Sequence, residues 1–117
     1  MTAAAARRKV RHGPERRAIK MWDGDVSVLA WERAGPRAPA LHFAHANGFN
    51  GLTYRSLLEG LGDEARIYAS DLRGHGQTTL AANPKGMQSW LIYRDDILRV
   101  LQEGDGRPKI LAGHSMG

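Results

Sequence analysis

The last nine residues of the sequence hold its most reactive arrangement of side chains. An apolar run, Lys109 to Ala112, leads directly into Gly113-His114-Ser115-Met116-Gly117. A Gly-x-Ser-x-Gly motif after a buried strand predicts a sharp strand-to-helix reversal, whose strained backbone lifts the serine hydroxyl above the sheet. Ser115 is therefore the candidate nucleophile for acyl transfer. The backbone N–H of Met116 is a candidate donor to the oxyanion that such a reaction forms.

The motif fixes three of five positions, so a chance match is the alternative interpretation. Its glycines argue for the reversal, because the strand and the segment after it would approach too closely at Gly113 and Gly117 for side chains. The required strand is present on the amino-terminal side.

Two earlier loops, each after a short apolar run, strengthen the interpretation. They are His45-Ala46-Asn47-Gly48-Phe49 and Asp71-Leu72-Arg73-Gly74-His75-Gly76. The first resembles the His-Gly-type oxyanion loop of the α/β-hydrolases, and the second is similar to their Asp-x-Arg-Gly-His-Gly loop after the fourth strand. With the elbow form Gly-His-Ser-Met-Gly, the three motifs follow the family's order, and the resemblance spans Ala18 to Gly117.

The resemblance implies acyl transfer to water by a serine hydrolase. Ser115 would attack a carbonyl, a histidine would take its proton, an acid would orient that histidine, and two N–H groups would hold the oxyanion. The family's chain order is serine, then acid, then histidine, so both partners are expected beyond Gly117 and not at Asp71 and His75. A serine at the elbow argues against the dehalogenase and epoxide-hydrolase branches, which attack through a carboxylate.

One departure from the family pattern concerns the second oxyanion donor. The usual glycine after the first histidine is Ala46 here. The donor is then the N–H of Ala46, Asn47 or Gly48, of which we favour Asn47; the alternative is that these residues form only a tight turn. Phe49 and His114 are candidates for the border of the acyl pocket.

A second class of function competes with the enzyme: a non-catalytic hydrolase-like binding protein, or an inactive gene fragment. No histidines and carboxylates have the spacing of metal ligands, so we expect no metal, and no cofactor is implied. The expected partner is a small-molecule substrate. The substrate's identity and the oligomeric state do not follow from these residues.

The order of expected elements predicts an α/β fold, the N-terminal part of an α/β-hydrolase fold. An antiparallel hairpin (18–22 and 26–33, turning at 23–25) leads into a mostly parallel sheet with helices on both faces. The further expected strands are 41–44, 66–70 and 109–112. Tyr54, Leu57, Leu58 and Leu61 form one helical stripe, which Asn50 caps and Gly62 ends. The second helix, 89–103, should bury Trp90, Tyr93, Ile97, Val100 and Leu101 and carry an Asp95–Arg99 pair on its surface.

The net charge of +5 over 117 residues is concentrated at the amino terminus. Residues 1–20 hold 7 basic residues and one acidic residue, or +6, and the rest of the chain carries −1. We interpret residues 1–17 as a basic, disordered arm and 18–117 as the truncated domain, with no nucleic acid expected. Met21 is an alternative biological start.

No cysteine occurs, no apolar run approaches the roughly 20 residues of a membrane span, and the arm lacks the apolar stretch of a signal peptide. These features favour a cytoplasmic protein without a membrane segment. Without a helix after the elbow, strand 110–112 should be poorly covered. We therefore expect the 117-residue chain alone to be marginally stable and inactive.

Overall fold

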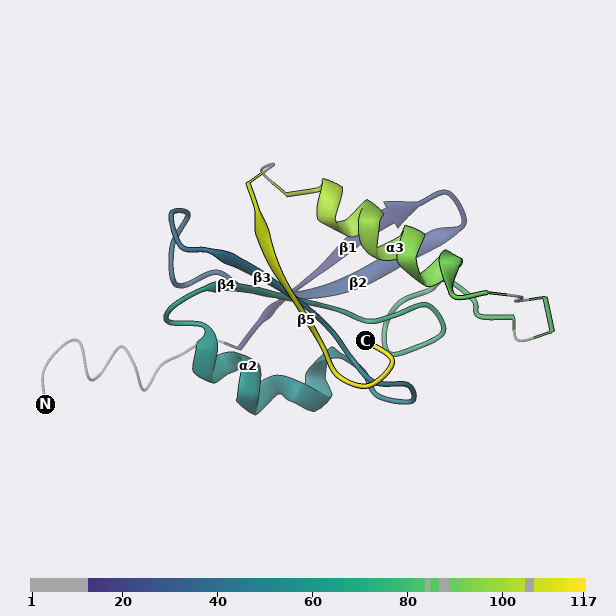
Figure 1. Cartoon of the computed structure of the whole chain (residues 1–117), viewed down its shortest axis with the longest axis horizontal. Coiled ribbons are helices and arrows are strands. Elements are labelled where there is room, and N and C mark those ends of the chain that lie inside the picture. The colour runs from purple at the N-terminus through teal and green to yellow at the C-terminus, as the bar shows by residue number, and fades with distance from the viewer. Residues whose placement is uncertain (1–12, 84, 87–88, 105–106) are drawn as a thin grey trace, which may run out of the picture.

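Five strands form a single mixed sheet with helices on both sides (Figure 1), in a computed structural model that describes residues 13–83, 85–86, 89–104 and 107–117. The strand order is β1-β2-β4-β3-β5. The elements are β1 Glu15–Met21, β2 Gly24–Trp31, β3 Ala40–Ala44, the 3-10 helix η1 Gly51–Tyr54, α2 Arg55–Leu61, β4 Arg66–Ser70, α3 Leu91–Gln102 and β5 Lys109–Gly113. The expected fold class is confirmed.

The antiparallel and parallel parts of the sheet meet at β4. Strands β1 and β2 form the expected hairpin, and β2 continues antiparallel onto β4. Strand β3 then runs parallel to both β4 and β5. The hairpin turns one residue earlier than expected, because Met21 pairs with Gly24 and leaves Trp22 and Asp23 as the turn. Carboxyl ends of β3, β4 and β5 consequently lie at one edge of the sheet.

Strand β1 begins at Glu15, three residues before the strand expected from residue 18, and so includes the last residues of the predicted arm. Arg16 and Arg17 are held in the strand by side-chain partners: Arg16 Nη1 donates to Ser27 Oγ (2.6 Å), and Arg17 pairs with Glu15 and Glu32. Charged residues fit an edge strand because one of its faces stays in contact with water. Residues 1–12 of the predicted arm lie outside the described residues.

Each face of the sheet has its own buried cluster, which explains why β2 carries apolar side chains on both of its faces. The face covered by α2 buries Leu29, Trp31, Phe43, Leu58, Ile67 and Ala69. The face covered by α3 buries Val26, Val28, Leu80 and Val100. A strand covered on both faces has this composition in α/β proteins. Figure 1 shows α2 and α3 on opposite sides of the sheet.

The first predicted helix is a 3-10 turn followed by an α-helix. Asn50 caps it as expected, since Asn50 Oδ1 accepts from Thr53 N (3.2 Å), and the helix ends before Gly62. The predicted stripe is only partly correct. Leu58 is buried, whereas Leu57 is 59% and Leu61 42% exposed, so α2 meets the sheet along a narrower line than the stripe implied.

Helix α3 buries Val100 as predicted, but Trp90 precedes the helix and is 66% exposed. The predicted Asp95–Arg99 pair is wrong: Arg94 pairs with Asp95, and Arg99 pairs with Glu103. An acidic residue is buried in the same helix. Asp96 accepts two hydrogen bonds from Arg73, both of 2.9 Å, and this bidentate pair offsets the cost of burying the carboxylate.

Strand β5 is the least covered strand, as expected. Ile110 is 52% and Leu111 62% exposed. A groove of about 460 Å³ runs between α3 and β5, with Tyr93, Ile97 and Met116 among the residues that line it. Within the described part of the chain, no helix is long and apolar enough to cross a bilayer.

Candidate functional site: an elbow and two loops at one sheet edge

The chain reverses sharply at Ser115, directly after β5. Ser115 has φ 57°, and in the described residues it is the only non-glycine residue with a positive φ. A serine pays a strain cost in this left-handed region, and such strain is concentrated at functional sites. Gly117 N donates to the His114 carbonyl (3.0 Å), which closes the turn.

Both glycines of the motif are required by close backbone approaches. A Cβ added to Gly113 would lie 2.1 Å from the carbonyl carbon of Gly117. A Cβ added to Gly117 would lie 2.0 Å from the carbonyl oxygen of Ala44, at the end of β3. Gly113 therefore approaches Gly117, and Gly117 approaches β3, more closely than a side chain at either position would allow. His114 N also donates to Ala44 O (3.1 Å), so the turn is docked where the first loop begins.

His45 joins the two loops that follow β3 and β4. It is buried; its Nδ1–H donates to Ala46 O (2.8 Å), and its Nε2 accepts from Leu72 N (2.9 Å). Burial is the main cause that lowers the pKa of His45, with a smaller contribution from neighbouring His75. A neutral imidazole with both nitrogens hydrogen-bonded is a structural link between the two loops.

His75 is likewise held inside the loops. Its Nε2 accepts from Gly48 N (3.0 Å), and its Nδ1–H donates to Arg73 O (2.9 Å). Asn47 Oδ1 lies 3.2 Å from the same Nε2. No histidine of the described residues forms a hydrogen bond with the Ser115 hydroxyl.

The three candidate oxyanion donors in the first loop differ in their hydrogen bonds. Ala46 N donates to the Tyr54 hydroxyl (3.1 Å), and Gly48 N donates to His75. For Asn47 N, no acceptor occurs among the described residues, and the same holds for Met116 N. Of the candidate donors in the described residues, the N–H groups of Asn47 and Met116 are thus the ones left without an acceptor.

Asp71 fixes the conformation of both loops, a role that sequence reasoning missed. Its buried carboxylate accepts from Gly51 N (2.8 Å) and Gln77 N (2.9 Å), and it pairs with Arg16 (3.2 Å). The Asp-x-Arg-Gly-His-Gly motif marks the residue, but it does not show which backbone groups the carboxylate binds.

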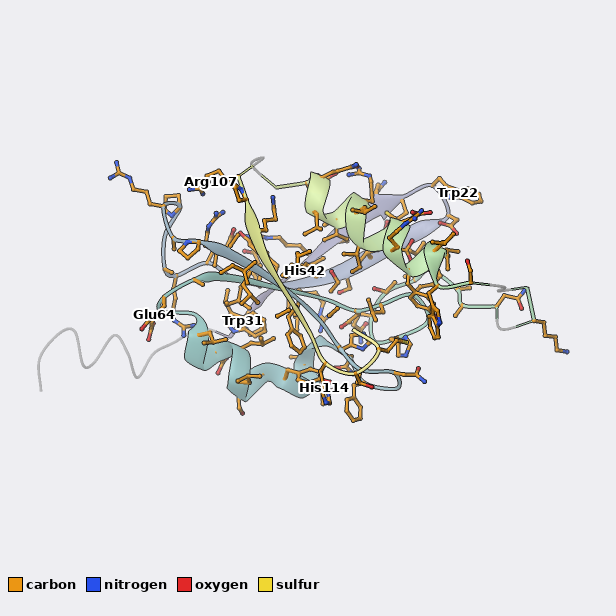
Figure 2. All side chains as sticks on the ribbon, viewed as in Figure 1. Trp22, Trp31, His42, Glu64, Arg107 and His114 are labelled. Atoms are coloured by element: carbon orange, nitrogen blue, oxygen red, sulfur yellow. The ribbon has the colours of Figure 1, made fainter. Side chains whose placement is uncertain are left out.

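Phe49 and His114, the candidate pocket residues, both contact Tyr54. The ring centroid of Phe49 lies 6.2 Å from that of Tyr54, and the ring centroid of His114 lies 5.8 Å from it. Figure 2 shows His114 at the turn after β5, on the side of the sheet that carries α2. No group of histidine and acidic side chains in the described residues could hold a metal ion.

Comparison with known proteins identifies the family. A family model of the alpha/beta hydrolase family matches residues 43–117, well over half of the chain. The chain therefore belongs to the α/β-hydrolase family. This match includes the first loop, the second loop and the elbow.

The names of the individual relatives point to different functions. The chain is 32% identical, over 98% of its length, to the magnesium-chelatase 30 kDa subunit of Rhodobacter capsulatus, and covers 35% of that protein. It is 31% identical, over 91% of its length, to esterase Rv0045c of Mycobacterium tuberculosis, and covers 33% of it. A solved thioesterase domain from the curacin biosynthetic pathway superimposes with a TM-score of 0.79 at 26% identity, over 91% of this chain and 37% of that one. The chain spans about a third of the length of the curated relatives it matches.

Proposed function

We propose that the complete protein is a serine hydrolase that cleaves an ester, amide or related carbonyl substrate through an acyl-enzyme on Ser115. The observation that carries the proposal is the strained φ of Ser115, held between two glycines that admit no side chain at the edge where three strands end. Strain at one serine in a closely fitted turn is the geometry of a nucleophile elbow. The hydrolase relatives and the α/β-hydrolase family support the same reaction class.

In the proposed reaction, the Ser115 oxygen attacks the substrate carbonyl carbon while its proton passes to a histidine beyond Gly117. Negative charge develops on the former carbonyl oxygen, where the N–H groups of Asn47 and Met116 donate to it. Collapse of this intermediate expels the protonated leaving group and leaves the acyl group on Ser115. A water molecule then gives a proton to the histidine and attacks the ester carbonyl, the acyl group leaves as a carboxylic acid, and the histidine returns the proton to the serine oxygen.

In this proposal, an acid and a histidine beyond Gly117 would complete the catalytic triad, so the 117-residue chain alone would be inactive. Phe49 and His114 would border a pocket for a small-molecule substrate, and the chemistry needs no cofactor. A cytoplasmic location is a further part of the proposal, with which a sequence free of cysteine is compatible.

Fluorophosphonate labelling of the complete gene product tests the nucleophile. We expect labelling and p-nitrophenyl ester turnover in the wild type, with labelling abolished and turnover reduced about 10⁴-fold or more in Ser115→Ala. Ser56→Ala, an exposed serine on α2, is the matched control and should label normally. Full turnover by Ser115→Ala would refute the proposal.

A second candidate is a non-catalytic, hydrolase-like subunit, and the identity to a magnesium-chelatase subunit is the observation that favours it. The same experiment separates the two candidates. A folded wild-type protein that neither labels nor turns over esters, in spite of an intact Ser115, would support the second candidate.

A further inference from the structure

The Tyr54 hydroxyl lies between the first loop (residues 45–49) and the elbow (residues 113–117). It is 3.1 Å from Ala46 N and 2.8 Å from Nδ1 of His114. We propose that Tyr54 is a positioning residue for the hydrolytic reaction, one whose hydroxyl bridges these two segments and holds the N–H groups of Asn47 and Met116 in register. This inference rests on the proposed function.

One end of the bridge has a fixed direction: the Ala46 N–H can only donate, so the Tyr54 oxygen accepts from it. At the other end the hydroxyl pairs with His114 Nδ1, as donor or as second acceptor according to the imidazole tautomer. One hydroxyl thus connects residues that are 8 and 60 positions away in the sequence.

The hydroxyl is placed by rigid surroundings. Tyr54 ends η1, whose start is fixed by the Asn50 cap. Its ring packs against Phe43 with the ring centroids 4.6 Å apart, and Phe49 and His114 contact it from other sides. Aromatic packing on the ring leaves few orientations for the oxygen, which therefore lies ready to bridge the loop and the elbow.

The bridge also selects among the possible oxyanion donors. With Ala46 N–H bound to Tyr54 and Gly48 N–H bound to His75, Asn47 N–H is left between two anchored neighbours. Loss of the hydroxyl would free the Ala46 N–H. The elbow would then be tied to this part of β3 by the His114–Ala44 backbone hydrogen bond, and the distance between the two oxyanion donors would be less well defined. Misplacement of a catalytic group by about 1 Å can cost roughly 10²-fold in rate.

Tyr54→Phe in the complete gene product tests the bridge, because it removes the oxygen and keeps the packed ring. We expect kcat for a p-nitrophenyl ester to fall roughly 10- to 100-fold with KM nearly unchanged, since the donors act on the transition state and not on bound substrate. Tyr68→Phe is the matched control, because the Tyr68 hydroxyl is hydrogen-bonded to one side chain, that of Glu32, which lies away from the elbow. It should keep the wild-type kcat.

Variants of His114 test the same bridge from its other end, and they provide the test if Tyr54→Phe fails to fold. His114→Gln retains a polar side chain that can hydrogen-bond to the hydroxyl and should lose less kcat than His114→Leu, which should lose as much as Tyr54→Phe. The double variant should lose no more than either single one, because both remove one interaction.

The results separate this inference from the proposed function. Wild-type kcat in Tyr54→Phe or in His114→Leu, with turnover that still needs Ser115, would overturn the bridge and leave the hydrolase intact. Additive losses in the double variant would also overturn it. A wild type without Ser115-dependent turnover would overturn the proposed function itself.

Discussion

The two halves of the candidate site are built in different ways. The loops after β3 and β4 are cross-linked by buried side chains, with Asp71 and His45 each binding backbone groups of neighbouring segments. The segment from β5 to the elbow is largely exposed, and its shape depends on backbone pairing with β3 and on two close glycine contacts. Side-chain hydrogen bonds thus shape one half, while backbone geometry shapes the other.

This difference predicts different sensitivities to mutation. Removing a side chain should damage the loops most, because buried N–H groups would lose their acceptors. Adding a side chain should damage the elbow most, because there is no space for one. Substitutions in each half, and a change of pH, therefore test this contrast.

Asp71→Ala should have the largest effect. It would leave Gly51 N and Gln77 N without their acceptor, and Arg16 without its acidic partner, at a cost of about 3–5 kcal/mol in the free energy of unfolding. Urea unfolding of the complete gene product measures the change. Asp95→Ala, which breaks an exposed pair with Arg94, should cost about 1 kcal/mol or less. Equal costs for the two variants would contradict the view that buried side-chain bonds hold the loops.

Gly117→Ala tests the elbow by adding one methyl group. The new Cβ would clash with the Ala44 carbonyl oxygen, so the turn must move away from β3, at a cost of roughly 3 kcal/mol. Turnover should also fall about 10²-fold, because Ser115 moves with the turn.

Gly60→Ala is the matched control for that substitution. Gly60 lies within α2 with open space around a new Cβ, so alanine should stabilise the protein by about 0.5–1 kcal/mol through its better helix propensity. Wild-type activity and stability in Gly117→Ala would show that the elbow does not depend on this close contact.

Acid should destabilise β3, the strand shared by the two halves. His42 is buried and hydrogen-bonded to Ser70 Oγ (2.7 Å), and burial lowers its pKa from 6.5 to about 4. Below pH 6.5 the unfolded chain gains a proton that the folded chain takes up only near pH 4, so stability falls as the pH drops through this window. We expect a loss of about 2 kcal/mol between pH 7 and pH 5 from this group.

The measurement is urea unfolding at both pH values, compared with His42→Gln. Glutamine can keep a hydrogen bond to Ser70 but does not titrate, so the variant should lose less stability on acidification by about that amount. An identical pH dependence in both proteins would contradict the assignment to His42.

Sequence reasoning located the elements of the fold because their signals are local. Alternating and 3.6-residue patterns gave the strands and helices to within a few residues, and the cap at Asn50 is a short-range feature. The errors concern which side chains are buried and which ions pair. Leu57 and Leu61 are exposed, and Asp96 is buried. Arg99 pairs with Glu103 in place of Asp95. A helical pattern does not show how wide a surface of the sheet is available to cover the helix. Nor does it show that Arg73, in a distant loop, pairs with the carboxylate of Asp96.

By itself the sequence determined the position of Ser115, the glycines around it and the two loops that accompany it, because tight turns demand particular residues at fixed spacing. Only the tertiary structure decided which N–H groups those loops leave available and that Tyr54 connects the first loop to the elbow. Such hydrogen bonds join segments that are distant along the chain. Their existence depends on how the sheet brings strand ends together, which no local pattern encodes.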